Sequence, residues 1–168
     1  DPCQKCLPGR YSNNNTPTPC ETCNISFEPN ANRTGCVRCA PGKYSDDDSV
    51  CKNCDIGQYN KEQGQNVCKD CDIGQYQMLG GQYECEVIPD GIYIDVGYRL
   101  RTCNRGQQPN ANLTGCVNCA AGRYSDDNGV CKNCPNGQIQ SSLGQDGCKN
   151  CHFTEIPIAD KSRCVDIC

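Results

Sequence analysis

Apolar and polar positions alternate most regularly in one stretch of this chain, close to its middle. Every second residue there is apolar, and the five residues are Ile92, Ile94, Val96, Tyr98 and Leu100. A period of two places such residues on one face of a β-strand. The pattern therefore predicts a strand with one apolar face within residues 86–102. No segment of the chain shows the apolar spacing of an amphipathic helix.

Cysteines organise the rest of the chain. Most of them occur in Cys-x-x-Cys doublets, and several of the loops that follow begin Cys-x-x-Gly-x-Tyr, as at Cys39–Tyr44 and Cys54–Tyr59. The glycine suits a backbone position with positive φ or a close approach of two chain segments. The tyrosine supplies a large apolar face, and turn-forming residues follow it. Each loop is thus predicted to be a short strand, a turn and a return strand, held at both ends by sulfur.

The chain also contains a longer repeat, which includes several of the short ones. Asn30–Cys36 recurs as Asn110–Cys116, and Cys51–Cys54 recurs as Cys131–Cys134, in both cases after 80 residues. The same offset aligns Cys23 with Cys103, which makes Cys85 and Cys103 a doublet split by an insertion. We therefore expect a first set of repeats in 1–71, a split repeat with the inserted strand in 72–102, and a second set in 103–168 that repeats 23–71. An array of this kind should be elongated, because each unit contacts mainly its neighbours.

The composition agrees with a disulfide scaffold. The chain has 168 residues, 20 of which are cysteine, and cysteine inflates the hydrophobic share of 36%. Large aliphatic residues are therefore scarce in this chain. They are too few to form a conventional core, which excludes the usual enzyme folds. No apolar run is long enough to span a membrane, and a net charge of −4 argues against nucleic-acid binding. The predicted fold class is small and disulfide-rich: a tandem array of short β-hairpin cysteine-rich units with no helix of note.

The sequence leaves the cysteine pairing open, since spacing alone does not fix connectivity. One scheme pairs the first cysteine with the third and the second with the fourth in blocks of four, for example Cys3–Cys20 and Cys6–Cys23. The other is a ladder in which the second cysteine of a doublet pairs with the first of the next, for example Cys6–Cys20. The ladder leaves Cys3 and Cys168 without partners, so the crossed scheme is favoured. In either scheme a closed loop of about 15 residues contributes about 3 kcal/mol in the chain-entropy model.

Disulfides at this density indicate an oxidising compartment, and we expect the protein to be extracellular, either secreted or on the cell surface. Asn-x-Ser/Thr acceptors for N-glycans support this location. The four acceptors are Asn14, Asn24, Asn32 and Asn112. No signal peptide begins at Asp1, so we expect a mature chain or a piece of a longer one.

The doublets with their glycine and tyrosine resemble a known class of extracellular repeats. Cys36-Val-Arg-Cys-Ala-Pro-Gly-Lys-Tyr44 and Cys3-Gln-Lys-Cys-Leu-Pro-Gly-Arg-Tyr11 are similar to the cysteine-rich repeats of tumour-necrosis-factor receptors and, more closely, to ephrin-receptor-like repeats. The richness in asparagine and glutamine, with the run Asn13–Asn15, also resembles that of the cysteine-periodic surface antigens of ciliates. The resemblance implies a non-enzymatic receptor, stalk, matrix or coat protein. Ile139 departs from the pattern, as do the loops Cys23–Cys36 and Cys151–Cys164, which lack the glycine.

Other chemistries have weaker support. Doublets at this spacing suit a Cys₄ zinc site, but the acceptor asparagines and the repeated Gly-x-Tyr units favour disulfides. The single histidine, His152, is expected to be a loop residue, because a cysteine nucleophile would need a free thiolate. The acidic residues Asp46–Asp48 and Asp126–Asp127 suit solvated turns better than calcium ligands. We therefore expect no catalytic residues, no bound metal and no cofactor.

These observations lead to two functional hypotheses. The first is a structural or adhesive ectodomain, stalk or surface-coat component that contacts other extracellular proteins or copies of itself. The alternative is a receptor-like module that binds a ligand. In both, the apolar face of Ile92, Ile94, Val96, Tyr98 and Leu100 is the candidate partner-binding strand, by strand addition or packing. The competing interpretation is that the segment folds on its neighbours as a hairpin around Pro89–Gly91.

Overall fold

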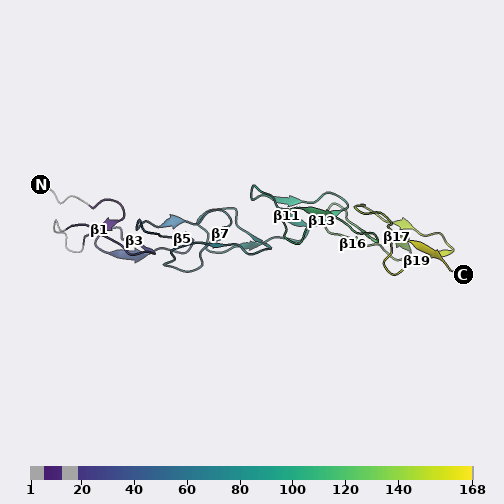
Figure 1. Ribbon diagram of the computed structural model, residues 1–168, viewed down its shortest axis with the longest axis horizontal. Coiled ribbons are helices and arrows are strands. Elements are labelled where there is room, and N and C mark those ends of the chain that lie inside the picture. The colour runs from purple at the N-terminus through teal and green to yellow at the C-terminus, as the bar shows by residue number, and fades with distance from the viewer. Residues whose placement is uncertain (1–5, 13–18, 168) are drawn as a thin grey trace. The chain divides into compact units, whose positions relative to one another are not determined.

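The protein is described by a computed structural model (Figure 1) that covers residues 6–12 and 19–167. Within these residues there is no helix, and every strand is two or three residues long. The strands pair in chain order as antiparallel hairpins, each forming its own two-stranded sheet. The predicted fold class, a disulfide-rich tandem array of small hairpins, is confirmed.

Each hairpin uses two consecutive strands. The first five hairpins contain β1 (Arg10–Tyr11) and β2 (Glu21–Thr22), β3 (Phe27–Pro29) and β4 (Cys36–Arg38), β5 (Lys43–Tyr44) and β6 (Lys52–Asn53), β7 (Gln58–Tyr59) and β8 (Lys69–Asp70), and β9 (Gln75–Tyr76) and β10 (Glu86–Val87). The next five contain β11 (Ile92–Ile94) and β12 (Leu100–Thr102), β13 (Gln107–Pro109) and β14 (Cys116–Asn118), β15 (Arg123–Tyr124) and β16 (Lys132–Asn133), β17 (Gln138–Ile139) and β18 (Lys149–Asn150), and β19 (Glu155–Pro157) and β20 (Cys164–Asp166).

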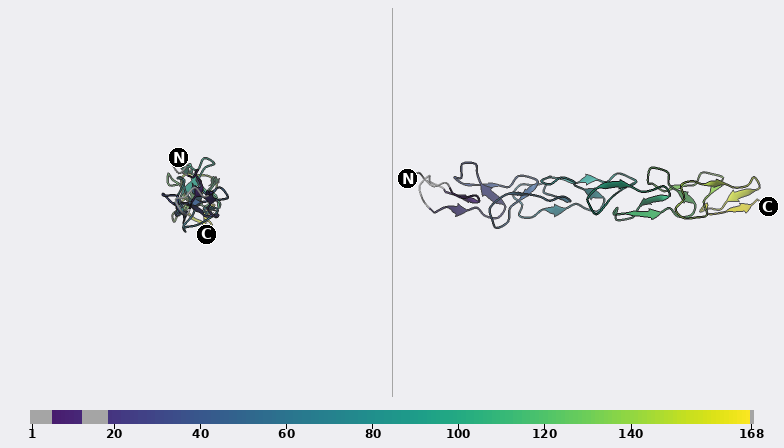
Figure 2. Two further views of the ribbon diagram at one scale, coloured as in Figure 1. Left: turned by 90° about the vertical axis from the view of Figure 1, so that its left-hand side faces the viewer. Right: turned by 90° about the horizontal axis from the view of Figure 1, so that it is seen from above.

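The chain divides into two compact units, Asp1–Glu86 and Val87–Cys168, and the division falls within β10. The first unit holds hairpins 1 to 5 and the second holds hairpins 6 to 10. Within each unit the hairpins follow one another in chain order (Figure 1 and Figure 2). The segment predicted as an insertion is thus one further hairpin, the first of the second unit.

The disulfides form the ladder and not the crossed blocks. Each bond joins the second cysteine of one doublet to the first cysteine of the next. The bonds are Cys6–Cys20, Cys23–Cys36, Cys39–Cys51, Cys54–Cys68, Cys71–Cys85, Cys103–Cys116, Cys119–Cys131, Cys134–Cys148 and Cys151–Cys164. The favoured pairs Cys3–Cys20 and Cys6–Cys23 are therefore wrong, since Cys20 and Cys23 have other partners. Each bond closes a single hairpin, and Cys3 and Cys168 lie outside the described residues.

A glycine turn opens most hairpins, and its role is clearest at Gly42. The amide of Lys43 donates to the carbonyl oxygen of Ala40 at 3.1 Å, and Gly42 has a φ of +80°. A Cβ atom at Gly42 would lie 2.1 Å from the carbonyl oxygen of Gly81, which belongs to the hairpin two further along. Positive φ and close approach, the two roles predicted for this glycine, are both present.

Within each of the two units, backbone hydrogen bonds connect each hairpin to the next. The Gly42 amide donates to the Asn60 carbonyl oxygen at 2.7 Å, and the Gly57 amide donates to that of Gln77 at 2.8 Å. Asn60 is buried and donates through Nδ2 to the Lys43 carbonyl oxygen at 3.1 Å. The interior between hairpins thus contains hydrogen bonds as well as sulfur, although Oδ1 of Asn60 has no hydrogen-bond partner among the described residues.

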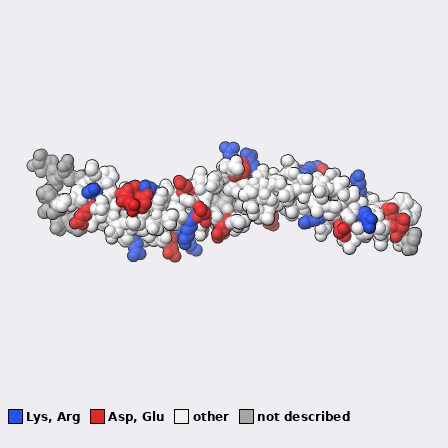
Figure 3. Space-filling view, viewed as in Figure 1, with Lys and Arg blue, Asp and Glu red and all other residues white. Residues whose placement is uncertain are grey.

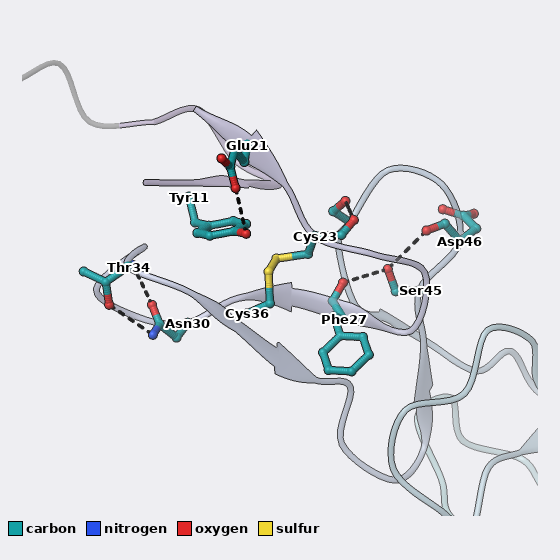
Figure 4. The surroundings of a disulfide bond; sticks show 10 residues. Tyr11, Glu21, Cys23, Phe27, Asn30, Thr34, Cys36, Ser45 and Asp46 are labelled. Carbon is teal, nitrogen blue, oxygen red and sulfur yellow. Dashed lines mark hydrogen bonds between the residues drawn. A yellow bond between two sulfur atoms is a disulfide. The ribbon is translucent and has the colours of Figure 1, made fainter. Parts of the chain in front are cut away.

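Cysteine replaces aliphatic side chains in the core. Cys39, Cys54 and Cys119 are almost completely buried, together with small polar residues such as Ser45. Among the described residues, Ile88 is the only buried hydrophobic residue that is not a cysteine. Figure 4 shows one such centre, where the Cys23–Cys36 bond lies between the Tyr11–Glu21 hydrogen bond, at 3.0 Å, and the bond from Ser45 Oγ to the Phe27 carbonyl oxygen, at 3.2 Å.

Candidate interaction surface

The segment that was predicted to be one partner-binding strand forms two strands joined by a turn in the structure. In the sixth hairpin Ile92 pairs with Thr102, Tyr93 with Arg101, and Ile94 with Leu100. The chain reverses at residues 95–99, here called the hairpin tip, and not at Pro89–Gly91. The prediction of one continuous strand was wrong, and so was the place of the reversal. The segment does fold back as a hairpin, as the competing interpretation expected.

The apolar residues assigned to one face separate into two groups. Ile92, Ile94 and Leu100 are half-buried, and Ile94 and Leu100 face one another across the strand pair. Val96 and Tyr98 lie in the tip, where Val96 is 105% exposed and Tyr98 is 48% exposed. The hairpin therefore turns three of the five residues partly inward and leaves two exposed.

Asp95 holds the tip in one conformation. Its Oδ1 atom accepts hydrogen bonds from the amides of Gly97 at 2.9 Å and Arg99 at 3.0 Å. Its Oδ2 atom accepts one from Nε of Arg101 at 3.0 Å. The Arg99 amide, followed by the Arg101 side chain, lowers the pKa of the Asp95 carboxyl group, because these donors favour its charged form. The tip is therefore an ordered turn built around one carboxylate.

Tyr98 has a backbone conformation that large side chains rarely adopt. Its φ is +56°, and its amide donates to the Asp95 carbonyl oxygen at 2.9 Å. A bulky residue with positive φ is strained, and such strain persists where the surroundings enforce it. The Asp95 hydrogen bonds provide that enforcement. The result is an exposed tip that presents Val96 and the Tyr98 ring in a fixed arrangement.

A shallow groove of about 360 Å³ lies at the other end of the same hairpin, within the second unit. It is lined by Ile88, Pro89, Asp90, Gly91, Gln108, Pro109, Leu113, Gly129 and Val130. In the first unit Arg33 occupies the position of Leu113, and its Nη1 atom donates to the carbonyl oxygen of Cys6. Leu113 has no such donor. The groove therefore has an apolar side chain where the first unit has a partly buried polar contact.

The N-glycan acceptors lie in two kinds of turn. Asn24 begins the tight turn closed by the Phe27 amide and the Asn24 carbonyl oxygen at 3.1 Å. Asn32 and Asn112 occupy matching turns 80 residues apart, and all three side chains are exposed. Asn14 lies outside the described residues. Exposure at a turn makes these three asparagines accessible for modification.

The acidic clusters are neutralised by neighbouring cations. Lys52 contacts Asp46 at 2.9 Å and Asp48 at 2.8 Å, and Arg105 contacts Asp127 at 2.7 Å. The Lys52 ammonium lowers the pKa of Asp46, and the Arg105 guanidinium lowers that of Asp127. Figure 3 shows charges of both signs on the viewed face. Within the described residues, no group of histidine, cysteine, aspartate and glutamate side chains has a metal-binding arrangement.

The other residues considered for catalysis or metal binding are His152 and the cysteines. His152 is exposed in a turn, with its Nδ1 atom 3.1 Å from Oγ1 of Thr154 and its ring tilted by 41° against that of Phe153. The bonded cysteines have no thiolate to offer zinc or a substrate. Over 6–12 and 19–167, no helix is long and apolar enough to cross a membrane.

No protein-family model matches the chain, and no curated protein matches it. The groove was not recognised from the sequence, and the reversal of the sixth hairpin was expected at Pro89–Gly91 instead of at residues 95–99. The signal was present in Cys85-Glu-Val-Ile88 and Leu100-Arg-Thr-Cys103, two doublets in which an aliphatic residue stands where a cysteine is expected.

Proposed function

We propose that this chain is a non-enzymatic extracellular protein that serves as an ectodomain, stalk or surface-coat component and works through protein–protein contacts. Support comes from the ladder of disulfides, which persists in oxidising compartments, and from the exposed N-glycan acceptors Asn24, Asn32 and Asn112. We also propose that these repeats are related to receptor-type cysteine-rich repeats, because their cysteine doublets are followed by glycine and tyrosine.

The single observation that carries this proposal is the hairpin tip. Val96 is completely exposed and lies next to Tyr98, whose strained backbone is held by the Asp95 hydrogen bonds. Ordering costs less on binding when the backbone of the contact residues is already ordered, so an apolar tip built on an ordered turn is suited to association while the hairpin is closed. The partner we favour is another copy of the protein, because a coat or stalk is built from many identical chains.

The test is sedimentation of the purified full chain over a range of concentrations, with Val96→Asp as the variant. Self-association is expected in the wild type and should be lost in Val96→Asp, because a charge at the centre of a contact is costly to desolvate. Ile73→Asp is the matched control, since Ile73 is 77% exposed in a turn of the first unit. Association that survives Val96→Asp but not Ile73→Asp would contradict the tip as the contact site.

The groove supports a second candidate function, a receptor-like module that binds a ligand. Its lining by Ile88, Pro109 and Leu113, with the carboxylate of Asp90 at its edge, suits an apolar group that carries a donor. The two functions differ in valence. A receptor-like module should remain monomeric and bind a distinct molecule, which sedimentation with and without that molecule distinguishes.

A further inference from the structure

The sixth hairpin has aliphatic residues at both positions that carry a disulfide in its neighbours. Ile88 precedes β11 by four residues, as Cys103 precedes β13. Leu100 begins β12 opposite Ile94, as Cys116 begins β14 opposite Pro109. The separation of 88 and 100 equals that of Cys39–Cys51 and Cys119–Cys131, which is 12 residues. The hairpin therefore keeps the geometry of the repeat and lacks its covalent bond.

What holds this hairpin closed is weak compared with a disulfide. Ile88 is 6% exposed, but Leu100 is only half-buried. Other noncovalent contacts add to this, among them the Asp95 turn, the short strand pair, the packing of Gly91 against the Asn128 backbone and the hydrogen bond from the Ile94 amide to the Leu113 carbonyl oxygen at 2.8 Å. An isolated two-stranded hairpin is marginally stable in water. In the neighbouring hairpins the loop stays closed when such contacts break, because the disulfide remains.

We propose that the sixth hairpin is a noncovalent joint that opens by itself while the disulfide-closed hairpins stay closed. Opening frees the chain between Val87, the last residue of β10, and Cys103, and no disulfide among the described cysteines spans this segment. Sixteen residue steps separate these two residues, so the freed segment extends to at most about 58 Å. The chain thus contains one segment that lengthens reversibly, placed between two sets of hairpins whose loops are covalently closed. This proposal does not depend on which partner the protein binds.

The test restores the missing bond. In Ile88→Cys/Leu100→Cys the two thiols should form a further disulfide, seen as a loss of two hydrogens in the intact mass. Hydrogen exchange is then measured on the full chain in both proteins. In the wild type, amides of 92–102 should exchange at least tenfold faster than those of 107–118, the next hairpin, which the Cys103–Cys116 bond closes. In the variant, 92–102 should slow by roughly a hundredfold and 107–118 should not change.

Three results would overturn the proposal. The first is equal protection of 92–102 and 107–118 in the wild type. The second is an unchanged exchange rate in the variant after the bond has formed, and the third is that the introduced thiols stay free. A second variant, Ile88→Ala, needs no new bond. It should speed exchange in 92–102 alone, and faster exchange throughout the second unit would show that the hairpin does not open by itself.

Discussion

Arg33 reaches from the second hairpin to the first, where its Nη1 atom donates a hydrogen bond to the carbonyl oxygen of Cys6. Lys161 does the same for Cys134 through its Nζ atom, across an equal sequence separation of 27 residues. Both residues have positive φ, and so does Leu113, which lies at the matching position of the seventh hairpin. A basic side chain fills this site in two places and a leucine leaves it apolar in the third.

This relationship predicts a reciprocal exchange. In Leu113→Arg the new guanidinium should donate to the carbonyl oxygen of Ile88 and fill the groove. In Arg33→Leu the corresponding site of the first unit should become apolar and open. The backbone tolerates both changes, because the φ angles of residues 33 and 113 differ by only 2°. Fluorescence of a dye that binds exposed apolar surface should fall for Leu113→Arg and rise for Arg33→Leu. Equal fluorescence in both variants would contradict the assignment of the groove.

Two glycines separate the cost of backbone conformation from the cost of close packing. Gly42 and Gly137 have φ values of +80° and +78°, but a Cβ atom at Gly137 meets nothing within 4 Å. Gly137→Ala should therefore lower the free energy of unfolding by about 1–2 kcal/mol, the cost of a left-handed alanine. Gly42→Ala should cost more, because its Cβ atom would overlap the Gly81 carbonyl oxygen. Thermal unfolding followed by near-ultraviolet circular dichroism measures both, and equal losses would show that the neighbouring hairpin moves aside freely.

Much of the fold could be predicted because its local rules are visible in the residues. The strand–turn–strand unit was predicted from Gly42, Tyr44 and the turn-forming residues that follow them, and the structure confirms it. The cysteine pairing could not be predicted, because the same spacing permits crossed blocks and a ladder. In the structure each disulfide closes a single hairpin, as Cys39–Cys51 does, and sequence spacing does not show which cysteines the folded hairpins bring together.

The continuous strand predicted in the sixth hairpin, and the place of its reversal, were wrong for a different physical reason. Ile94 and Leu100 are six residues apart, an even number, so the alternation of apolar residues continues through the turn without a break. Periodicity alone cannot distinguish one nine-residue strand from two short strands joined by such a turn. The only residue that marks the reversal is Gly97, and its effect depends on the Asp95 side chain that accepts its amide. A carboxylate that caps a turn looks the same in sequence as one on a polar strand face.

The ladder itself has a direct chemical test. Arg38 is exposed between Cys36 and Cys39, so trypsin should cleave after it without reduction of the protein. In the ladder this cut separates the Cys23–Cys36 loop from everything after residue 38, because no bond between the described cysteines crosses the site. In crossed blocks a Cys36–Cys51 bond would keep the pieces together. Mass spectrometry of the non-reduced digest should show the peptide that ends at Arg38 linked only to residues before it.

The hairpin tip should depend on pH through Asp95. The pKa of this carboxyl group is lower in the folded protein than its ordinary value of 3.8, because the Arg99 and Gly97 amides and the Arg101 side chain favour the charged form. A depressed pKa contributes stability that is present above 3.8 and is lost as the pH falls through the folded value. Amide exchange at Gly97 and Arg99, corrected for the intrinsic pH dependence, should therefore accelerate below about pH 4. In Asp95→Asn the side-chain oxygen still accepts hydrogen bonds from both amides, but the acceleration below about pH 4 should disappear. The amides of β15 and β16, in the eighth hairpin, are the control, and their exchange rates should be the same in both proteins. An acceleration of equal size in Asp95→Asn would show that another group controls the tip.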